Sequence, residues 1–429
     1  MSDTSVSFRT ALRYWFSLGF INFGGPAGQI AMMHKDLVDQ RRWVDERTFL
    51  QALNFCMLLP GPEAHQLAVY LGWRMHGYAG GTVAGVFFVL PSVAIMLGLS
   101  WLAAAKGNVP AVAAIFHGIA AAVVAIVFEA VWRIGKKSLR HPALYAFAGI
   151  AFVLGYFLGV PFPLIVLCAG LSGMVLSPSH PEIFCHRASG SRECSMAEQE
   201  ASAALPSAWH LVRVTAVFAA IWAAVALPVF AIFGFDDTLS RIILFFTQAA
   251  FVTFGGAYAV LAYIAQYAVE LSWLSQAQML LGLGLAETTP GPLIMVTQFV
   301  GFMAAWNATG GLGGPSLGYA VAGGLLTTFA TFLPSFLFIF AGAPFIMAIT
   351  ANPRLGAALT GITAAVVGVV LQLAVFFARH TFFPAASAPD WFAIVLAGVT
   401  LVALVRFKVS MHVLIVGCGL LGFFWGFNS

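Results

Sequence analysis

Five stretches of this chain are too long and too apolar to belong to a water-soluble domain. Each exceeds the roughly 18 apolar residues that cross a bilayer as a helix. They lie at residues 79–105, 110–132, 208–233, 316–350 and 355–378. Only 8% of the 429 residues are charged, against about a quarter in soluble proteins. Because no β-barrel alternation is present, the sequence predicts an all-helical protein that crosses a membrane several times.

An internal repeat divides the chain into two halves. Five landmarks return in the same order: FINFGGPA (20–27) as FVTFGGAY (251–258), Trp43 as Trp273, PGP (60–62) as PGP (290–292), LPS (90–92) as LPS (333–335), and GIAAAVV (118–124) as GITAAVV (361–367). Unrelated apolar helices would not keep this order. The sequence therefore predicts two homologous domains, 1–176 and 236–429. Between them we expect a polar cytoplasmic linker at 177–207 and a connecting transmembrane helix at 208–235.

Basic residues indicate that the two halves face opposite sides of the membrane. Cytoplasmic loops are enriched in Lys and Arg. The loop at 34–47 carries four such residues and its counterpart at 265–276 carries none. The single unrepeated helix would turn the second half over if each half crosses an even number of times. The sequence therefore predicts an inverted repeat, although Arg241 and Arg379 fall on the opposite side.

The number of crossings is left open by the segment at 48–76. A re-entrant hairpin there and in the second half gives nine crossings, whereas two short crossings in each half give thirteen. Both counts keep the halves inverted.

Each half is predicted to contain two helix breaks, at a Gly-Gly pair and at PGP. The break residues are Gly24, Gly25, Gly61, Pro62, Gly255, Gly256, Gly291 and Pro292. Broken backbone in a bilayer is tolerated only where it is buried in protein or lines water, and matching breaks in two inverted halves point to a transporter's substrate site. A helix that starts after PGP would present free N–H groups and a positive dipole end to an anion. Ordinary proline kinks are the alternative.

Ionisable residues lie beside the PGP breaks. Glu63 and His65 follow the first break and Glu287 precedes the second, and ionisable groups at membrane depth are functional candidates. We expect Glu63 and Glu287 to couple protons to anion movement, because a carboxyl takes up a proton when an anion approaches. His65 could titrate near neutral pH or be structural, and Glu63 could simply cap its helix.

Neutral and basic residues complete the candidate site. Gln66 and Thr289 are expected to bind the anion together with the break residues. Asn22, Gln29 and Asn54 are further candidate donors, and helix–helix contact is their alternative role. The residues expected to form a cytoplasmic anion vestibule are Lys35, Arg41 and Arg42, because basic side chains draw anions towards a site; a solvated loop is the alternative.

The ordered motifs resemble those of the chromate ion transporter family in its long, two-domain form. FGGPAGQI, RRWVDERTF and LLPGPEAHQLAVYLGWRMHG resemble the N-terminal domain, and FGGAYAVL and GLAETTPGPLIM resemble the C-terminal domain. The resemblance implies proton-motive export of chromate across the bacterial inner membrane, which would confer chromate resistance. It also implies two homologous domains in opposite orientation. The first Gly-Gly is followed by Pro26 and the second by Ala257, so the two breaks need not be equivalent.

Other functions remain as alternatives. A carrier of sulfate or another oxyanion would share the dipole chemistry, and so would an anion channel. An enzyme is not expected, because we find no nucleophile motif and no Cys/His metal spacing. We expect no cofactor, no metal and no nucleic acid partner, and a homodimer is left open.

Overall fold

The computed structural model of the protein describes residues 6–23, 25–107, 109–184, 208–254, 256–309, 316–346, 349, 352–384 and 388–426. Within these ranges, five helices are long and apolar enough to cross a membrane. They are α4 (Glu63–Lys106), α5 (Pro110–Ser138), α10 (Ala208–Phe233), α15 (Leu317–Gly342) and α17 (Pro353–Phe382). Each coincides with one of the five predicted stretches, so the prediction of a helical, multi-pass membrane protein is confirmed.

The remaining helices are shorter. The first half contains α1 (Phe8–Ile21), α2 (Gly25–His34), the π-helix η1 (Lys35–Gln40), α3 (Glu46–Leu58), α6 (Pro142–Tyr156), α7 (Phe162–Leu176) and α8 (Pro181–Phe184). The second contains α11 (Thr238–Val252), α12 (Ala257–Glu270), α13 (Gln276–Thr288), the 3₁₀ helix η2 (Leu293–Met295), α14 (Val296–Thr309), η3 (Ala343–Phe345), α18 (Trp391–Phe407) and α19 (Met411–Gly426).

The helices of the two halves follow the same order. α4 loses helical geometry at His76 and Gly77, which divides it into a first and a second arm. The first arm then corresponds to η2 with α14, and the second arm corresponds to α15. Even the helix starts agree, because Asp45 caps α3 and Ser275 caps α13 at the same position of the repeat, each through a side-chain oxygen that accepts a backbone N–H.

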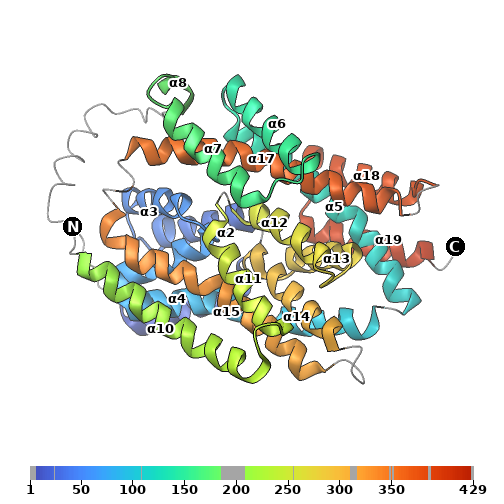
Figure 1. Ribbon diagram of the computed structural model, residues 1–429, viewed down its shortest axis with the longest axis horizontal. Helices are drawn as coiled ribbons and strands as arrows, with labels where there is room; N and C mark the ends of the chain where they lie inside the picture. The colour runs from blue at the N-terminus through green and yellow to red at the C-terminus, as the bar shows by residue number, and fades with distance from the viewer. Residues whose placement is uncertain are drawn as a thin grey trace.

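Each half packs its last two helices on the long helix of the other half. α6 and α7 lie along α17, and α18 and α19 lie along α5, as Figure 1 shows. The repeated GIAAAVV and GITAAVV motifs make this close packing possible. A methyl group on Gly118 would overlap Cys418 of α19, and one on Gly361 would overlap Ala169 of α7. Small residues at such crossings let helices in a membrane approach closely.

The unrepeated helix α10 lies at the edge of the molecule, against α15 and α11, at the lower left of Figure 1. The polar stretch that precedes it was predicted to be a loop from 177 onwards. It instead contains the short helix α8, whose Phe184 is buried and packs edge-on against the ring of Phe147. The rest of the predicted linker, 185–207, lies outside the described residues.

Two helices next to the PGP break are too short to cross a bilayer. α3 has 13 residues, about 20 Å at 1.5 Å per residue, and the first arm of α4 is equally short. Both fall below the roughly 30 Å of a hydrocarbon core.

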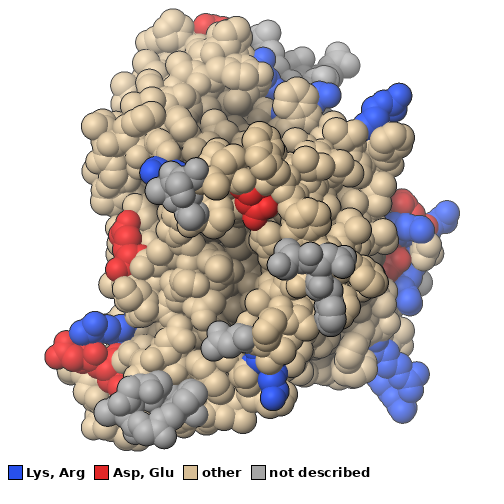
Figure 2. All heavy atoms as spheres, turned by 90° about the vertical axis from the view of Figure 1, so that its right-hand side faces the viewer, with Lys and Arg blue, Asp and Glu red and all other residues tan. Residues whose placement is uncertain are grey.

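Figure 2 shows one face of the molecule, on which charged side chains lie mostly near the margins and the middle is largely uncharged and hollowed.

Candidate functional site

The PGP segment of each half contacts the Gly-Gly break of the other half. The Gly61 N–H donates a hydrogen bond to the carbonyl of Thr253 (3.1 Å), and the Gly291 N–H donates to the carbonyl of Asn22 (3.2 Å). Thr253 and Asn22 occupy the same position of the repeat. The two bonds therefore form a reciprocal pair that satisfies broken backbone inside the protein.

Glycine is required at the centre of each PGP. Gly61 has φ +114° and Gly291 has φ +118°, a conformation that other residues adopt only at a cost. Space is equally limited. A Cβ on Gly61 would lie 3.0 Å from Ser335 Oγ, and one on Gly291 would lie 2.6 Å from Ser92 Cβ. These serines end the repeated LPS motifs, which explains why LPS recurs in both halves.

Side-chain amides strengthen one side of this contact more than the other. Gln29 Nε2 donates to the carbonyls of Gly291 (2.6 Å) and Asn22 (2.9 Å). The equivalent residue of the second half is Val260, which has no amide. Gln66 Nε2 donates to the Pro60 carbonyl (2.7 Å). In this conformation the predicted donors Gln29 and Gln66 therefore hold the breaks in place.

The Glu63 carboxylate lies where the two halves meet. Its Oε1 would be 3.3 Å from a Cβ on Gly256, the residue that precedes α12. Gly256 has φ +90° and ends the second Gly-Gly break. The Glu63 carboxylate therefore lies close to the N-terminal end of α12, where a helix stabilises negative charge. The residue is half-buried.

Glu287 lies near the same end of α12 but is bound differently. Its Oε1 accepts a 2.8 Å hydrogen bond from the hydroxyl of Tyr258, in the first turn of α12. Only 7% of Glu287 and 6% of Tyr258 are exposed, so this carboxyl is enclosed whereas Glu63 is partly open. α12 thus brings both predicted proton-linked carboxyls to one helix end.

Two other predicted residues have local partners. Thr289 Oγ1 donates to the Leu285 carbonyl (2.7 Å) within its own chain segment. His65 is fully buried, with the rings of Phe332 and Phe336 edge-on at 4.9 and 5.0 Å. Aromatic rings thus enclose His65, and neither of its ring nitrogens has a hydrogen-bond partner within the described residues.

The predicted basic vestibule lies around η1. Arg41 stacks on the rings of Tyr14 and Trp43, with its guanidinium carbon 5.1 and 5.0 Å from the ring centres, in a cation–π arrangement. Lys35 and Arg42 are exposed.

Pro62 and Pro292 immediately precede the helical segments after the breaks, and Gly25 has φ +67°. The predicted residues Gly24 and Gly255 lie outside the described residues.

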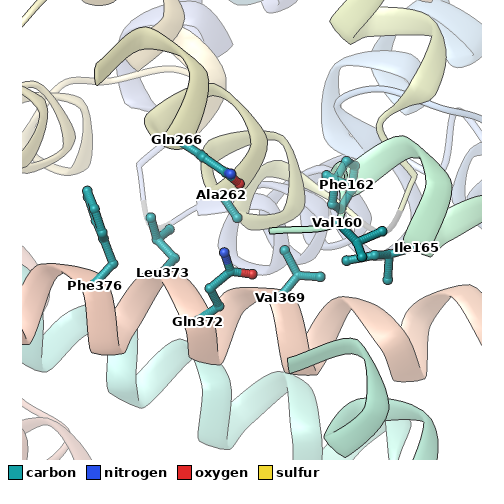
Figure 3. Close-up of a pocket in the computed structure, with 9 residues that line it drawn as sticks. All are labelled: Val160, Phe162, Ile165, Ala262, Gln266, Val369, Gln372, Leu373 and Phe376. Atoms are coloured by element: carbon teal, nitrogen blue, oxygen red, sulfur yellow. The ribbon is translucent and has the colours of Figure 1, made fainter. Parts of the chain in front are cut away.

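Two cavities adjoin the helices of the site without including its predicted residues. The smaller, about 40 Å³, lies between α12, α17 and the start of α7, and Figure 3 shows Gln266 and Gln372 directed into it. The larger, about 660 Å³, lies among the ends of α4, α5, α13, α14 and α17 and is lined by His117 and His380.

Sequence reasoning missed Tyr258 and the two LPS serines. Tyr258 follows the second Gly-Gly pair after one intervening residue. Nothing in the sequence indicates that it contacts a carboxylate 29 residues away. Ser92 and Ser335 belong to a motif that was recognised as a landmark, and its repetition was the available signal.

These features define a class of protein: a multi-pass helical membrane protein whose broken helices meet between two related halves, as in many secondary transporters. A model of the family described as "Chromate transporter" matches residues 10–174 and 240–423. The chain therefore belongs to the chromate transporter family, as its motifs indicated.

Curated relatives agree with this assignment. A chromate transport protein of Pseudomonas aeruginosa is 32% identical over 97% of this chain and 92% of its own length. One of Cupriavidus metallidurans is 28% identical, covering 97% of this chain and 93% of its own. A probable chromate transport protein of Synechococcus elongatus is 27% identical over 88% of this chain and 86% of its own. No solved structure matches the chain.

Proposed function

We propose that this protein exports chromate from the bacterial cytoplasm across the inner membrane as a secondary transporter, and so confers chromate resistance. Support comes from the family and from relatives that are named chromate transport proteins over nearly their whole length. Energetics favour export, because a dianion leaving a negative cytoplasm gains about 2.3 kcal/mol per charge per 100 mV. The same site chemistry fits sulfate, which shares the tetrahedral shape and charge.

The observation that carries the mechanism is the reciprocal pair of hydrogen bonds from Gly61 to Thr253 and from Gly291 to Asn22. It supports two inverted halves that rock against each other at their broken helices. The oxyanion would bind where the halves meet, at the first turn of α4 and beside Gly256. We expect the other break residues named in the sequence analysis to line this binding site.

Proton coupling follows from the place of Glu63. Its carboxylate occupies the N-terminal end of α12, a position that also suits an oxyanion. A proton on Glu63 would remove the competing charge and let chromate take that position, so that proton binding and chromate binding would be coupled. Glu287, held by Tyr258, is the second proton-linked group.

Transport into everted membrane vesicles tests this proposal. Wild type should accumulate chromate with a rate that depends on pH, and Glu63→Gln should transport with a much weaker dependence. Glu287→Gln should alter the pH profile separately. An unchanged pH profile in both variants would contradict proton coupling through these carboxyls. Net uptake of chromate by intact cells would contradict the proposed direction of transport. Excess sulfate that abolishes chromate flux would identify sulfate as a competing ligand of the same site.

A further inference from the structure

Helix α3 presents a polar face that is largely exposed. Its buried side consists of Phe49, Ala52, Phe55 and Cys56. On the opposite side, Arg47, Leu50 and Asn54 are exposed and Gln51 is half-buried. Spacings of three and four residues place these side chains in one stripe along the helix. We call Arg47, Gln51 and Asn54 the α3 polar face.

The α3 polar face is unsuited to lipid. Within the described part of the chain, the side chains of Gln51 and Asn54 form no hydrogen bonds and Arg47 forms no ion pair. Polar groups exposed to hydrocarbon without partners are costly and rare. Water on this face would satisfy them. The stripe begins at the basic loop and leads towards the PGP break, where Glu63 is half-buried.

The equivalent face in the second half is apolar, and beyond the exposed Ala277 it is buried. Ala277, Leu281 and Gly284 of α13 stand where α3 has Arg47, Gln51 and Asn54. Leu281 is 5% exposed, and Gly284 lies against Ile119 and Val123 of α5. The same contrast extends to the preceding helices, because most of α12 is buried whereas only Gln29 and Met33 are buried in α2.

We propose that the α3 polar face lines the aqueous route by which the oxyanion reaches Glu63 from the side of the basic loop. This inference rests on the proposed function and adds the route and its residues. A guanidinium and two amides offer N–H donors, which are the groups that bind oxyanions. From Arg47 to Leu58, α3 contains no acidic residue. In the present conformation Asn54 of α3 is exposed, whereas Leu281 and Gly284 of α13 are buried.

Cysteine labelling tests whether the route is aqueous. In a background without the native cysteines, Gln51→Cys and Asn54→Cys should react in everted vesicles with a membrane-impermeant maleimide, and chromate should slow the reaction. Leu283→Cys, at a fully buried position of α13, should stay unlabelled. Unreactive Gln51→Cys and Asn54→Cys would overturn the proposal, since lipid or a second copy of the chain would then cover this face.

Transport kinetics test whether the residues contact the anion. Gln51→Leu, which copies Leu281, and Asn54→Leu should each raise the KM for chromate about 3- to 10-fold, the value of a lost hydrogen bond, with little change in kcat. Asn54→Asp should raise it further by adding negative charge. Gln266→Leu, an amide on α12 bonded to Glu270, is the control and should keep the wild-type KM.

The two levels of the proposal fail separately. If Gln51→Leu and Asn54→Leu transport chromate with the wild-type KM, the proposed route is wrong and the proposal of chromate transport stands. A wild-type protein that moves no chromate while the impermeant reagent still labels Asn54→Cys would overturn the proposed cargo.

Discussion

Two carboxyls near one helix end differ in what surrounds them. Glu63 is half-buried and adjoins a glycine, so water or an anion can reach it. Glu287 is enclosed and bound to a tyrosine hydroxyl. Glu287 is held by its donor, whereas the Glu63 side chain forms no hydrogen bond within the described residues. The two residues are therefore suited to different steps of a transport cycle.

Tyr258→Phe tests the role of the enclosed carboxyl. Loss of the hydroxyl leaves Glu287 without its donor, a change worth about 1–3 kcal/mol for a buried group. The pH–rate profile of transport should move to higher pH, because the tyrosine stabilises the ionised carboxylate. Tyr263→Phe is the matched control on α12, since its hydroxyl makes no hydrogen bond within the described residues. Equal profiles for the two variants would contradict this role.

Asp45 is expected to stabilise the start of α3. Its carboxylate accepts bonds from the N–H (2.8 Å) and the hydroxyl (2.7 Å) of Thr48, and these bonds lower the pKa of Asp45 below its ordinary 3.8. The stabilisation is therefore present above that pH and lost as pH falls through the lowered pKa. Asp45→Ala should cost about 1 kcal/mol in thermal unfolding in detergent at pH 7, and Asp45→Asn much less.

At the scale of helices, sequence patterns predicted the elements better than their partners. Hydropathy and the repeated PGP located the long helices and the PGP breaks, because glycine and proline act on their own backbone. The contacts of Gly61 with Thr253 and of Gly291 with Asn22 depend on how the halves meet, which local signals do not encode. For the same reason, Gln29 and Gln66 were predicted to bind an anion although their N–H groups bind backbone carbonyls.

Substitution of the PGP glycines tests the importance of this contact. Gly61→Ala and Gly291→Ala should each cost about 1–3 kcal/mol from the positive φ alone, and Gly291→Ala more because Ser92 is closer. Gly98→Ala in α4 is the control, since a methyl group there meets nothing within 4 Å. Thermal unfolding in detergent measures the order. Wild-type stability for both PGP variants would show that the contact does not hold the halves together.

At the scale of the whole molecule, the halves are held together by exchanged helices. α6 and α7 lie on α17, and α18 and α19 lie on α5. Composition and the repeat could predict two homologous units but not this exchange. A linear pattern says which residues of a helix are apolar, and either long helix would satisfy them.

Cleavage between the halves tests the exchange. With a protease site placed between 185 and 207, the cut protein should remain one particle in size-exclusion chromatography in mild detergent and keep its transport activity. The uncut protein is the control for size. Separation of the fragments under these conditions would mean that the covalent connection, and not the exchanged helices, keeps the halves together.

The exchanged helices also bear on ancestry. A polypeptide with only one such half would leave its long helix uncovered, and it would require a second copy to cover that helix. Fusion of two such units would turn that intermolecular surface into an internal one and would let each copy diverge. The amides of Gln29 and Gln66 in the first half, where the second half has Val260 and Val296, are a difference of the kind that such divergence would produce.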